Sequence, residues 1–416
     1  MSLKKNFIWA FAGNAVSAFC MWLILILLTK WAAVETVGVF GVAQAIGLPI
    51  SMLLSLKLQV AQVTDARDEF DFGHYYALRV ITSAMAVLIT AIVGFAIYEF
   101  DTAIIIAVLG LGYAIMSFRE VFLAVMQKSE RMDLMAVSRV FQGLFSLLLF
   151  GCFFWFTKNI VFAILGLVIA RIIVLLFYDV PVSRRLLHKN GYSKPIVPQW
   201  HSNIIWKLAK TTAPLGLVAW LGTLFTSLPR LFLDKFSGRE NVGYFVAMSS
   251  LLVAGTMIIA ALTQAASPRL AKYYAENIKA YKVLLLKLTI VGIGLGFTGI
   301  ITSVFFGRQI LTLLFTPEYA KHNNVFVLLV VAGLLLMLFS FMTVGLTAAR
   351  KFSVQVPLYA ICAIVCCVSS LFFIPKWGMT GAAASLIVCY LTGLTSCLCY
   401  VKKAIRIKQP EKLLEI

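Results

Sequence analysis

The chain has 416 residues, of which 61 % are hydrophobic and only 13 % are charged. Soluble domains carry roughly 45–50 % apolar residues even with glycine counted, and about 25 % charged residues. This composition excludes a water-soluble globule, a disordered chain, a coiled coil and a disulfide scaffold, and it predicts an integral membrane protein. The net charge of +19 would suggest a nucleic-acid partner in a soluble protein, so it must first be compared with membrane topology.

Twelve apolar runs are long enough to cross a bilayer, since a spanning helix needs about 20 residues. They lack the two-residue alternation of barrel strands. The first run is longer than a signal-peptide core, so we expect an uncleaved first helix. The expected fold is therefore an all-α polytopic membrane protein with about 12 transmembrane helices. The runs cover residues 7–29, 37–56, 78–98, 103–126, 135–157, 160–178, 211–233, 241–266, 283–306, 324–348, 356–374 and 378–401.

The basic residues are distributed unevenly between the two ends of these runs. With the N-terminus inside, 26 of the 36 Lys and Arg residues fall on the inner side and 7 on the outer side. The positive-inside rule then predicts that both termini are cytoplasmic. Because topology accounts for most of the positive charge, no nucleic-acid partner is expected. The remaining basic residues lie within the spans and are Arg119, Arg171 and Arg230.

A sequence motif occurs twice at an offset of 205 residues. Residues 28–40 and 233–245 are identical at six of thirteen positions, and Gln59 falls on Gln264 at the same offset. One copy joins spans 1 and 2 and the other joins spans 7 and 8, which predicts two parallel six-helix bundles. The expected domains are residues 1–180 and 211–401, with a basic cytoplasmic linker at 181–210 and a basic cytoplasmic tail at 402–416.

The chain lacks the usual signatures of catalysis. All eight cysteines lie in apolar runs without a CxxC motif, and the four histidines are in separate loops, so no metal site is expected. No Walker motif is present, so we expect neither ATP hydrolysis nor another cofactor. The longest outer loop, about residues 307–323, leaves little room for acid, base and substrate. These features favour a transporter over an enzyme.

Two arginines are placed deep in the predicted helices of the N-terminal half. Arg119 and Arg171 each lie about eight residues before the inner end of a span, which is roughly 12 Å at the rise of an α-helix. At that depth we expect both to face the bundle interior or a wet cavity. Two cations near one level suit an anionic substrate, because guanidinium binds phosphate through a fork of donors. The alternative is a structural pair with Glu120, Asp179 or helix carbonyls.

The other candidate residues have simpler alternatives. Arg230 follows Pro229, which can break a helix near a substrate, but Arg230 is shallow enough to snorkel to the interface. Glu120 could couple protons or compensate Arg119. Uncharged polar residues in the spans could bind sugar hydroxyls or hydrogen-bond neighbouring helices. These residues include Asn14, Gln44 and Gln264 as candidate substrate contacts, together with Ser17, Gln59, Gln62 and Gln142.

Two short motifs resemble those of a known family. Residues 35–44, which read Glu-Thr-Val-Gly-Val-Phe-Gly-Val-Ala-Gln, resemble the G-x-F segment of bacterial polysaccharide-biosynthesis flippases. So do Leu228-Pro229-Arg230 and residues 241–245 around spans 7 and 8. Length, span number and basic composition are similar to those of Wzx-type O-antigen flippases in the multidrug/oligosaccharidyl-lipid/polysaccharide exporter superfamily.

This resemblance implies a substrate and a location. The substrate would be an undecaprenyl-pyrophosphate-linked oligosaccharide, flipped from the cytoplasmic to the periplasmic leaflet of a bacterial inner membrane by alternating access through a cationic cavity. Membrane lipids and the polysaccharide polymerase and chain-length machinery are the implied partners. A drug/cation antiporter of the same superfamily is the first alternative, although such exporters typically place acids in the cavity. A polytopic polymerase or acyltransferase is the second, and the missing long outer loop argues against it.

Overall fold

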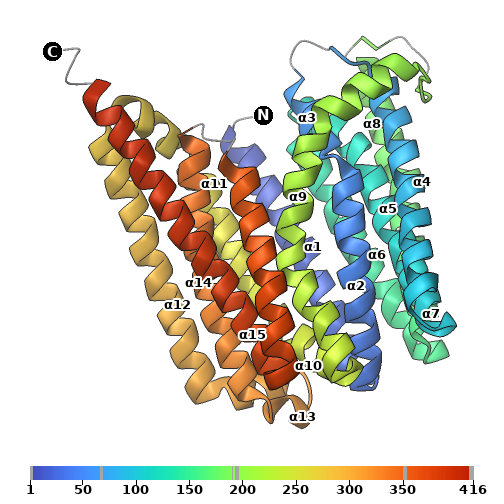
Figure 1. The fold of residues 1–416 in the computed structure, drawn as a ribbon. Helices are drawn as coiled ribbons and strands as arrows, with labels where there is room; N and C mark the ends of the chain where they lie inside the picture. The colour runs from blue at the N-terminus through green and yellow to red at the C-terminus, as the bar shows by residue number, and fades with distance from the viewer. Residues whose placement is uncertain (1–2, 66–68, 190, 193–195, 350–353, 412–416) are drawn as a thin grey trace. The chain divides into compact units, whose positions relative to one another are not determined.

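The computed structural model describes residues 3–65, 69–189, 191–192, 196–349 and 354–411, and it leaves out some side chains within helices, among them that of Gln264. Within these ranges the chain is helical and contains no strand. It divides into two compact units, Met1–Thr223 and Leu224–Ile416, and the division falls within helix α9 (Ser202–Ser237) (Figure 1). The all-α fold predicted from the sequence is confirmed.

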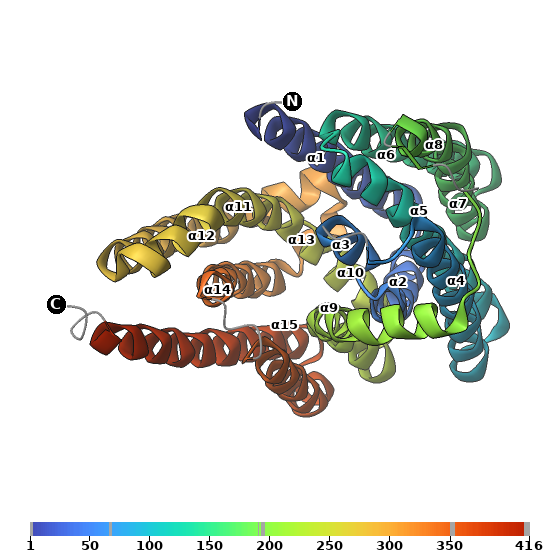
Figure 2. The ribbon, with the colours of Figure 1, turned by 90° about the horizontal axis from the view of Figure 1, so that it is seen from above.

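The first unit is built from long apolar helices packed side by side. α1 packs on α6, α4 on α5 and α6 on α7, and α2 also contacts α5 (Figure 2). Helices are the expected form here, because every backbone polar group in hydrocarbon needs a partner within its own segment. The elements are α1 (Leu3–Trp31), α2 (Val34–Ser55), α3 (Leu58–Thr64), α4 (Phe72–Ile97), α5 (Phe100–Lys128), α6 (Met132–Thr157), α7 (Ile160–Val174), the π-helix η1 (Leu175–Asp179), α8 (Val180–Lys189) and the first part of α9.

The second unit repeats the helix pairing of the first. α12 packs on α14 as α4 packs on α5, and α11 packs on α14 as α2 packs on α5. The end of α9 contacts α15 as α1 contacts α6, with the Phe225 and Tyr359 rings stacked at 5.6 Å. The duplicated motif predicts this correspondence. The elements are α10 (Arg239–Ser250), α11 (Leu252–Glu276), α12 (Ile278–Leu314), α13 (Pro317–Ala320), α14 (Asn323–Ala348) and α15 (Gln355–Glu411).

Helix α15 consists of two helices that meet at Gly378. The backbone of Gly378 has φ +53° and ψ −127°, which is not helical and is far easier for glycine than for any residue with a Cβ. On either side of this residue the two halves pack against each other, since the Cys389 thiol donates to the Cys362 carbonyl at 3.4 Å. The element is therefore a helical hairpin rather than one straight rod.

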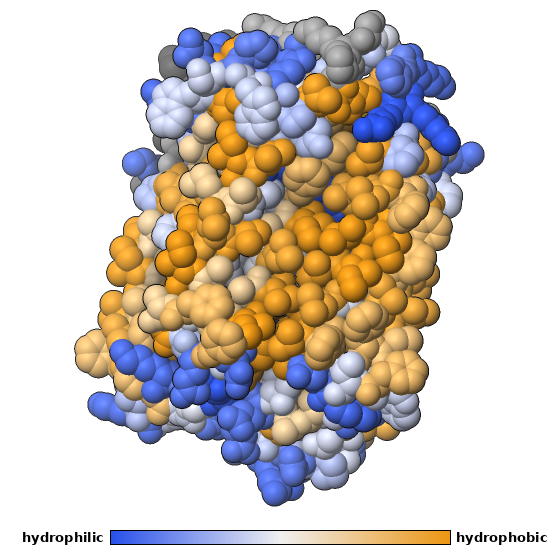
Figure 3. All heavy atoms as spheres, turned by 90° about the vertical axis from the view of Figure 1, so that its right-hand side faces the viewer, coloured by the Kyte–Doolittle hydropathy of each residue, from blue (hydrophilic) through white to orange (hydrophobic). Residues whose placement is uncertain are grey.

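Ten helices in the described ranges are long and apolar enough to span a membrane, compared with about twelve apolar runs in the sequence. The difference has two local causes. The run 241–266 is divided into α10 and α11 at Leu251, and the runs 356–374 and 378–401 are merged in α15. On the face drawn in Figure 3, hydrophobic residues form a broad belt between two hydrophilic ends, which is typical of a multi-pass membrane protein.

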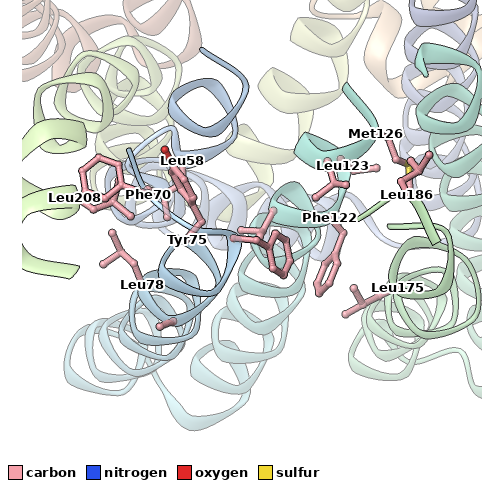
Figure 4. Packing of buried hydrophobic residues seen from close by; sticks show 14 of the residues in the cluster. Leu58, Phe70, Tyr75, Leu78, Phe122, Leu123, Met126, Leu175, Leu186 and Leu208 are labelled. Atoms are coloured by element: carbon pink, nitrogen blue, oxygen red, sulfur yellow. The ribbon is translucent and has the colours of Figure 1, made fainter. Parts of the chain in front are cut away.

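One end of the first unit is closed by a buried hydrophobic cluster. Its members come from α3, α4, α5, α6, η1, α8 and α9, together with Phe70 just before α4, and most of the larger ones are labelled in Figure 4. Leu186 of α8 and Leu208 of α9 belong to it, with exposed fractions of 8 % and 1 %. Residues of the stretch 181–210 therefore pack onto the first unit, at the same end as α3 (Figure 1).

Candidate substrate site

Arg119 on α5 lies in a buried triad that neutralises its charge. Its Nε–H donates to Asp179 Oδ2 at 2.6 Å, and its Nη2–H donates to Ser138 Oγ at 2.8 Å. The Ser138 hydroxyl in turn donates to Asp179 Oδ1 at 2.5 Å. The Arg119 and Asp179 side chains are 1 % and 0 % exposed. Because a buried charge is tolerated only when it is paired and hydrogen-bonded, this triad explains how Arg119 sits within a membrane helix.

Asp179 is the last residue of η1, which continues directly from α7. A π-helical turn holds more residues than an α-helical turn and is often found at functional sites. Its wider turn changes the direction in which later side chains leave the helix, and Asp179 here meets α5 and α6 together. The sequence indicates Asp179 only as a possible structural partner of Arg119 or Arg171, and the structure places it in contact with Arg119.

A second ion pair lies beside this triad. Arg79 on α4 is fully buried, and its Nη2–H donates to Glu120 Oε2 at 3.2 Å, while the Glu120 side chain is 23 % exposed. The Nε and Nη1 groups of Arg79 have no hydrogen-bond partner in the described part of the chain. The basic-residue distribution assigns Arg79 to the inner side, at the start of the predicted run 78–98. The structure places it within α4, which begins seven residues earlier at Phe72, so its side chain is buried between helices.

Arg171 on α7 is buried but incompletely partnered. Its side chain is 4 % exposed, and its guanidinium carbon lies 5.7 Å from the centre of the Tyr113 ring. Its Nε and Nη1 groups have no hydrogen-bond partner among the residues that are described. Gly112 makes room for it, since a Cβ at that position would lie 2.7 Å from Arg171 Nη1. Arg171 is thus a desolvated cation with spare donors.

The two arginines singled out in the sequence are not at one level. Arg119 is level with Asp179, whereas Arg171 packs against Gly112 and Tyr113 on α5. Gly112 precedes Arg119 by seven residues, which corresponds to about 10 Å along an α-helix. The expectation of a single level was wrong because it measured both depths from span ends. Arg171 lies about two turns farther from the end that carries α3 and α8.

A fourth arginine, Arg139 on α6, completes this group. It interacts electrostatically with Glu120 and Arg119, and Arg171 also interacts with Arg119. We call Arg79, Arg119, Arg139 and Arg171, with Glu120 and Asp179, the arginine cluster. Four guanidinium groups against two carboxylates leave an excess of positive charge inside the first unit. Such an environment favours an anion over a cation.

The other predicted site residues lie elsewhere. Asn14 is exposed on α1, and Gln44 is half-buried on α2. Arg230 is half-buried on α9 in the second unit, where it interacts electrostatically with Tyr390. Gln264 lies on α11, and its side chain is outside the described part of the chain. The structure thus brings together Arg119, Glu120 and Arg171, and it adds Arg79, Arg139 and Ser138.

No group of three or more His, Cys, Asp or Glu side chains is placed to hold a metal ion among the residues that the structure describes. The eight cysteines are all free thiols. The arginine cluster can recognise anions through its guanidinium groups, because their planar donors match phosphate oxygens.

The fold is that of known membrane transporters. The lipid II flippase MurJ, in an inward closed conformation, superposes with a TM-score of 0.74 at 13 % identity over 96 % of this chain and 89 % of MurJ. The MATE transporter VcmN of Vibrio cholerae gives 0.66 at 14 % identity over 98 % and 97 % of the two chains. A MOP superfamily transporter of Pyrococcus furiosus gives 0.63 at 14 % identity over 95 % and 94 %. The chain thus shares the fold of these transporters, and its long apolar helices are those of a multi-pass membrane protein.

Sequence comparison assigns the chain to a protein family. The polysaccharide biosynthesis protein family matches residues 3–274, and the chain belongs to this family. The capsular polysaccharide biosynthesis protein CapF of Staphylococcus aureus is 28 % identical over 405 residues, which cover 96 % of this chain and 100 % of CapF. The family resemblance seen in the sequence is confirmed.

Proposed function

We propose that this protein flips an undecaprenyl-pyrophosphate-linked oligosaccharide from the cytoplasmic to the outer leaflet of a bacterial cytoplasmic membrane. The repeat unit of O-antigen or a related surface polysaccharide is the substrate, and the likeness to CapF adds capsular polysaccharide to that class. Both termini face the cytoplasm in this proposal, which the uneven distribution of Lys and Arg supports. The polymerase and chain-length machinery act on the same repeat unit after it has crossed.

The observation that carries this proposal is the buried and incompletely partnered guanidinium of Arg171. A pyrophosphate diester has two ionised oxygens, and moving them into hydrocarbon without compensation is very costly. Spare donors on Arg171 and Arg79 supply hydrogen bonds to such a group, and the positive excess of the arginine cluster supplies the balancing charge. The polyisoprenoid chain can stay in the bilayer meanwhile.

The mechanism follows from the two kinds of arginine in the cluster. Arg119 is neutralised by Asp179 in this state, while Arg171 keeps free donors. Alternating access exposes the cluster first to one leaflet and then to the other, and the pyrophosphate takes the spare donors during transfer. After release, the cluster returns to the paired arrangement of Arg119 with Asp179 and Arg79 with Glu120.

A drug/cation antiporter is the weaker candidate. Such a transporter needs an ionised acid that is free to bind a proton or a cationic drug. In the first unit, Glu120 is paired with Arg79 and Asp179 with Arg119. Both acids are therefore already engaged, and the surplus charge has the wrong sign.

The test is transport by purified protein in vesicles that carry a fluorescently labelled undecaprenyl-pyrophosphate oligosaccharide. We expect Arg171→Met to abolish movement between leaflets. Arg308→Met, at an exposed position on α12, is the matched control and should transport normally. Unchanged transport by Arg171→Met, or resistance to toxic cations conferred by the wild type without lipid flipping, would overturn the proposal.

A further inference from the structure

A second candidate site lies away from the arginine cluster, at the end of the first unit where α3, α5 and α8 finish. It is a pocket of about 450 Å³ whose walls include Gln62, Phe70, Phe72, Lys128 and Tyr192. Small-molecule sites typically have volumes of roughly 300–1,000 Å³. The pocket is therefore large enough for a small ligand, and it belongs entirely to one unit.

Gln62 supplies the observation that points to a ligand. The residue lines the pocket and is only 4 % exposed, yet its Oε1 has no hydrogen-bond partner in the described part of the chain. Gln59, one turn earlier on the same helix, is different because its Nε2–H donates to Gln127 Oε1 at 3.0 Å. A buried amide oxygen without a partner is unfavourable. A hydroxyl or amide group of a ligand would satisfy it.

Aromatic rings form the apolar part of the walls. Phe70 and Tyr75 meet edge to face at 6.0 Å between ring centres, and Phe72 and Tyr192 do so at 6.4 Å (Figure 4 labels Phe70 and Tyr75). The ring faces carry partial negative charge, so they attract C–H groups with partial positive charge. The C–H face of a pyranose ring offers such groups.

The charged groups of the lining oppose each other in sign. Asp71 and Lys128 both line the pocket, and the Lys128 ammonium also donates to the Asp65 carbonyl at 2.8 Å. With one acid and one base, the pocket has no surplus charge to hold an anion. Carboxylate, amide and hydroxyl groups beside aromatic rings suit a neutral ligand with several hydroxyls.

From these features we infer that the pocket binds a neutral sugar residue. The choice of a glycan rests on the proposed function, in which the oligosaccharide first meets the protein at the end predicted to be cytoplasmic. The pocket then serves as a recruitment site for the head group before the pyrophosphate reaches the arginine cluster. Its specificity for neutral sugars sets which repeat units are accepted.

Binding of soluble sugars to the purified full chain tests this inference without requiring transport. Saturation-transfer NMR is recorded with methyl glycosides of glucose, galactose, N-acetylglucosamine and N-acetylgalactosamine, and with glucuronate and inorganic phosphate as charged probes. We expect saturable binding of at least one neutral glycoside, with a Kd on the order of 1 mM, and weaker binding of both anions. Gln62→Met should weaken the binding at least about fivefold, a loss on the order of 1 kcal/mol.

Two further variants make the result decisive. Gln59→Met is the matched control and should bind like the wild type, because its amide is engaged by Gln127. Leu187→Trp places a larger side chain in the pocket and should abolish sugar binding. This variant keeps the inference testable if Gln62→Met does not fold. The inference is overturned if no neutral glycoside binds saturably, if the anions bind better, or if Leu187→Trp binds normally. Arg171→Met should bind sugars normally, so a failure of transport and a failure of this pocket are told apart.

Discussion

Arg119 and Asp179 form a fully buried ion pair that joins α5 to the end of η1, with 2.6 Å between Nε and Oδ2. Ser138 on α6 hydrogen-bonds to both partners. Three helical segments are thus joined by a buried network of one ion pair and one hydroxyl group. Breaking such a pair by removing one partner is far more costly than replacing both, because the remaining charge stays buried.

The first prediction separates these two cases. Asp179→Asn should lower the free energy of unfolding by about 3–5 kcal/mol, because Arg119 loses its counter-charge. The double variant Arg119→Met/Asp179→Leu should recover most of that loss, which thermal unfolding in detergent followed by circular dichroism measures. A double variant as unstable as Asp179→Asn alone would show that the pair is not the cause. If the stable double variant still flips substrate, Arg119 is purely structural.

For Arg171 we predict opposite effects on stability and transport. Its guanidinium is desolvated without full hydrogen bonding, so Arg171→Met should raise the free energy of unfolding by about 1–3 kcal/mol. The same change should abolish surface-polysaccharide export in a deletion strain. Thermal unfolding and export are measured side by side, with Arg308→Met as the control. A destabilised Arg171→Met protein would mean that Arg171 supports the fold as Arg119 does.

Gly112 provides a gentler perturbation of the same arginine. A Cβ there would lie 2.7 Å from Arg171 Nη1, the mobile end of a long side chain, so the guanidinium should move while the helix stays intact. Gly112→Ala should therefore reduce the export rate severalfold with a change in stability within about 1 kcal/mol. Gly151→Ala is the matched control, since nothing lies closer than 3.9 Å to its Cβ. Equal export by both variants would argue against a placed Arg171.

Gly378 should be required for the α15 hairpin. Its φ of +53° with ψ of −127° is strained for any residue with a Cβ, so Gly378→Ala should destabilise the second unit by about 1–3 kcal/mol. Gly294→Ala, in the middle of α12 with open space around its Cβ, should instead be neutral or slightly stabilising. Thermal unfolding compares the two. A neutral Gly378→Ala would show that the two halves of α15 are joined differently.

The sequence predicts the helical class and most of the helices because long apolar runs leave few other structures in a membrane. It does not predict where a run is broken. The division at Leu251 has no proline or glycine signal of its own, and it depends on packing against neighbouring helices. Gly378, by contrast, stands at the start of the twelfth predicted run and could have marked the hairpin.

The candidate site is predicted in part for a related reason. Arg119 and Arg171 stand out because their surroundings in the sequence are apolar, whereas Arg79 and Arg139 lie close to the inner ends of predicted spans and were assigned to the inner side. α4 and α6 begin six and three residues earlier than the hydropathy indicates, and they place Arg79 in a buried position and Arg139 in a half-buried one. Glu120 lies in an apolar run and needs a positively charged partner. That need was the signal in the sequence that could have pointed to a further buried arginine. Pairwise contacts such as Arg79 with Glu120 still require the three-dimensional packing.

The last prediction concerns pH and the loop that borders the proposed sugar pocket. Burial raises the pKa of Asp65, but backbone N–H groups of Glu69 and Phe70, the Tyr75 hydroxyl and Lys128 outweigh the effect of burial, so the pKa lies below its usual range.

A lowered pKa means that the folded protein binds the proton less readily than the unfolded chain, so Asp65 stabilises the fold above its unfolded pKa of about 3.9. That stability is lost as the pH falls through the folded pKa. Asp65→Asn should therefore be less stable than the wild type at pH 7, and the difference should shrink and vanish as the pH falls through the folded pKa of Asp65. Thermal unfolding between pH 2.5 and 7 measures this, with the exposed Glu130→Gln as control. A difference that stays constant with pH would assign the loss to altered hydrogen bonding rather than to the Asp65 charge.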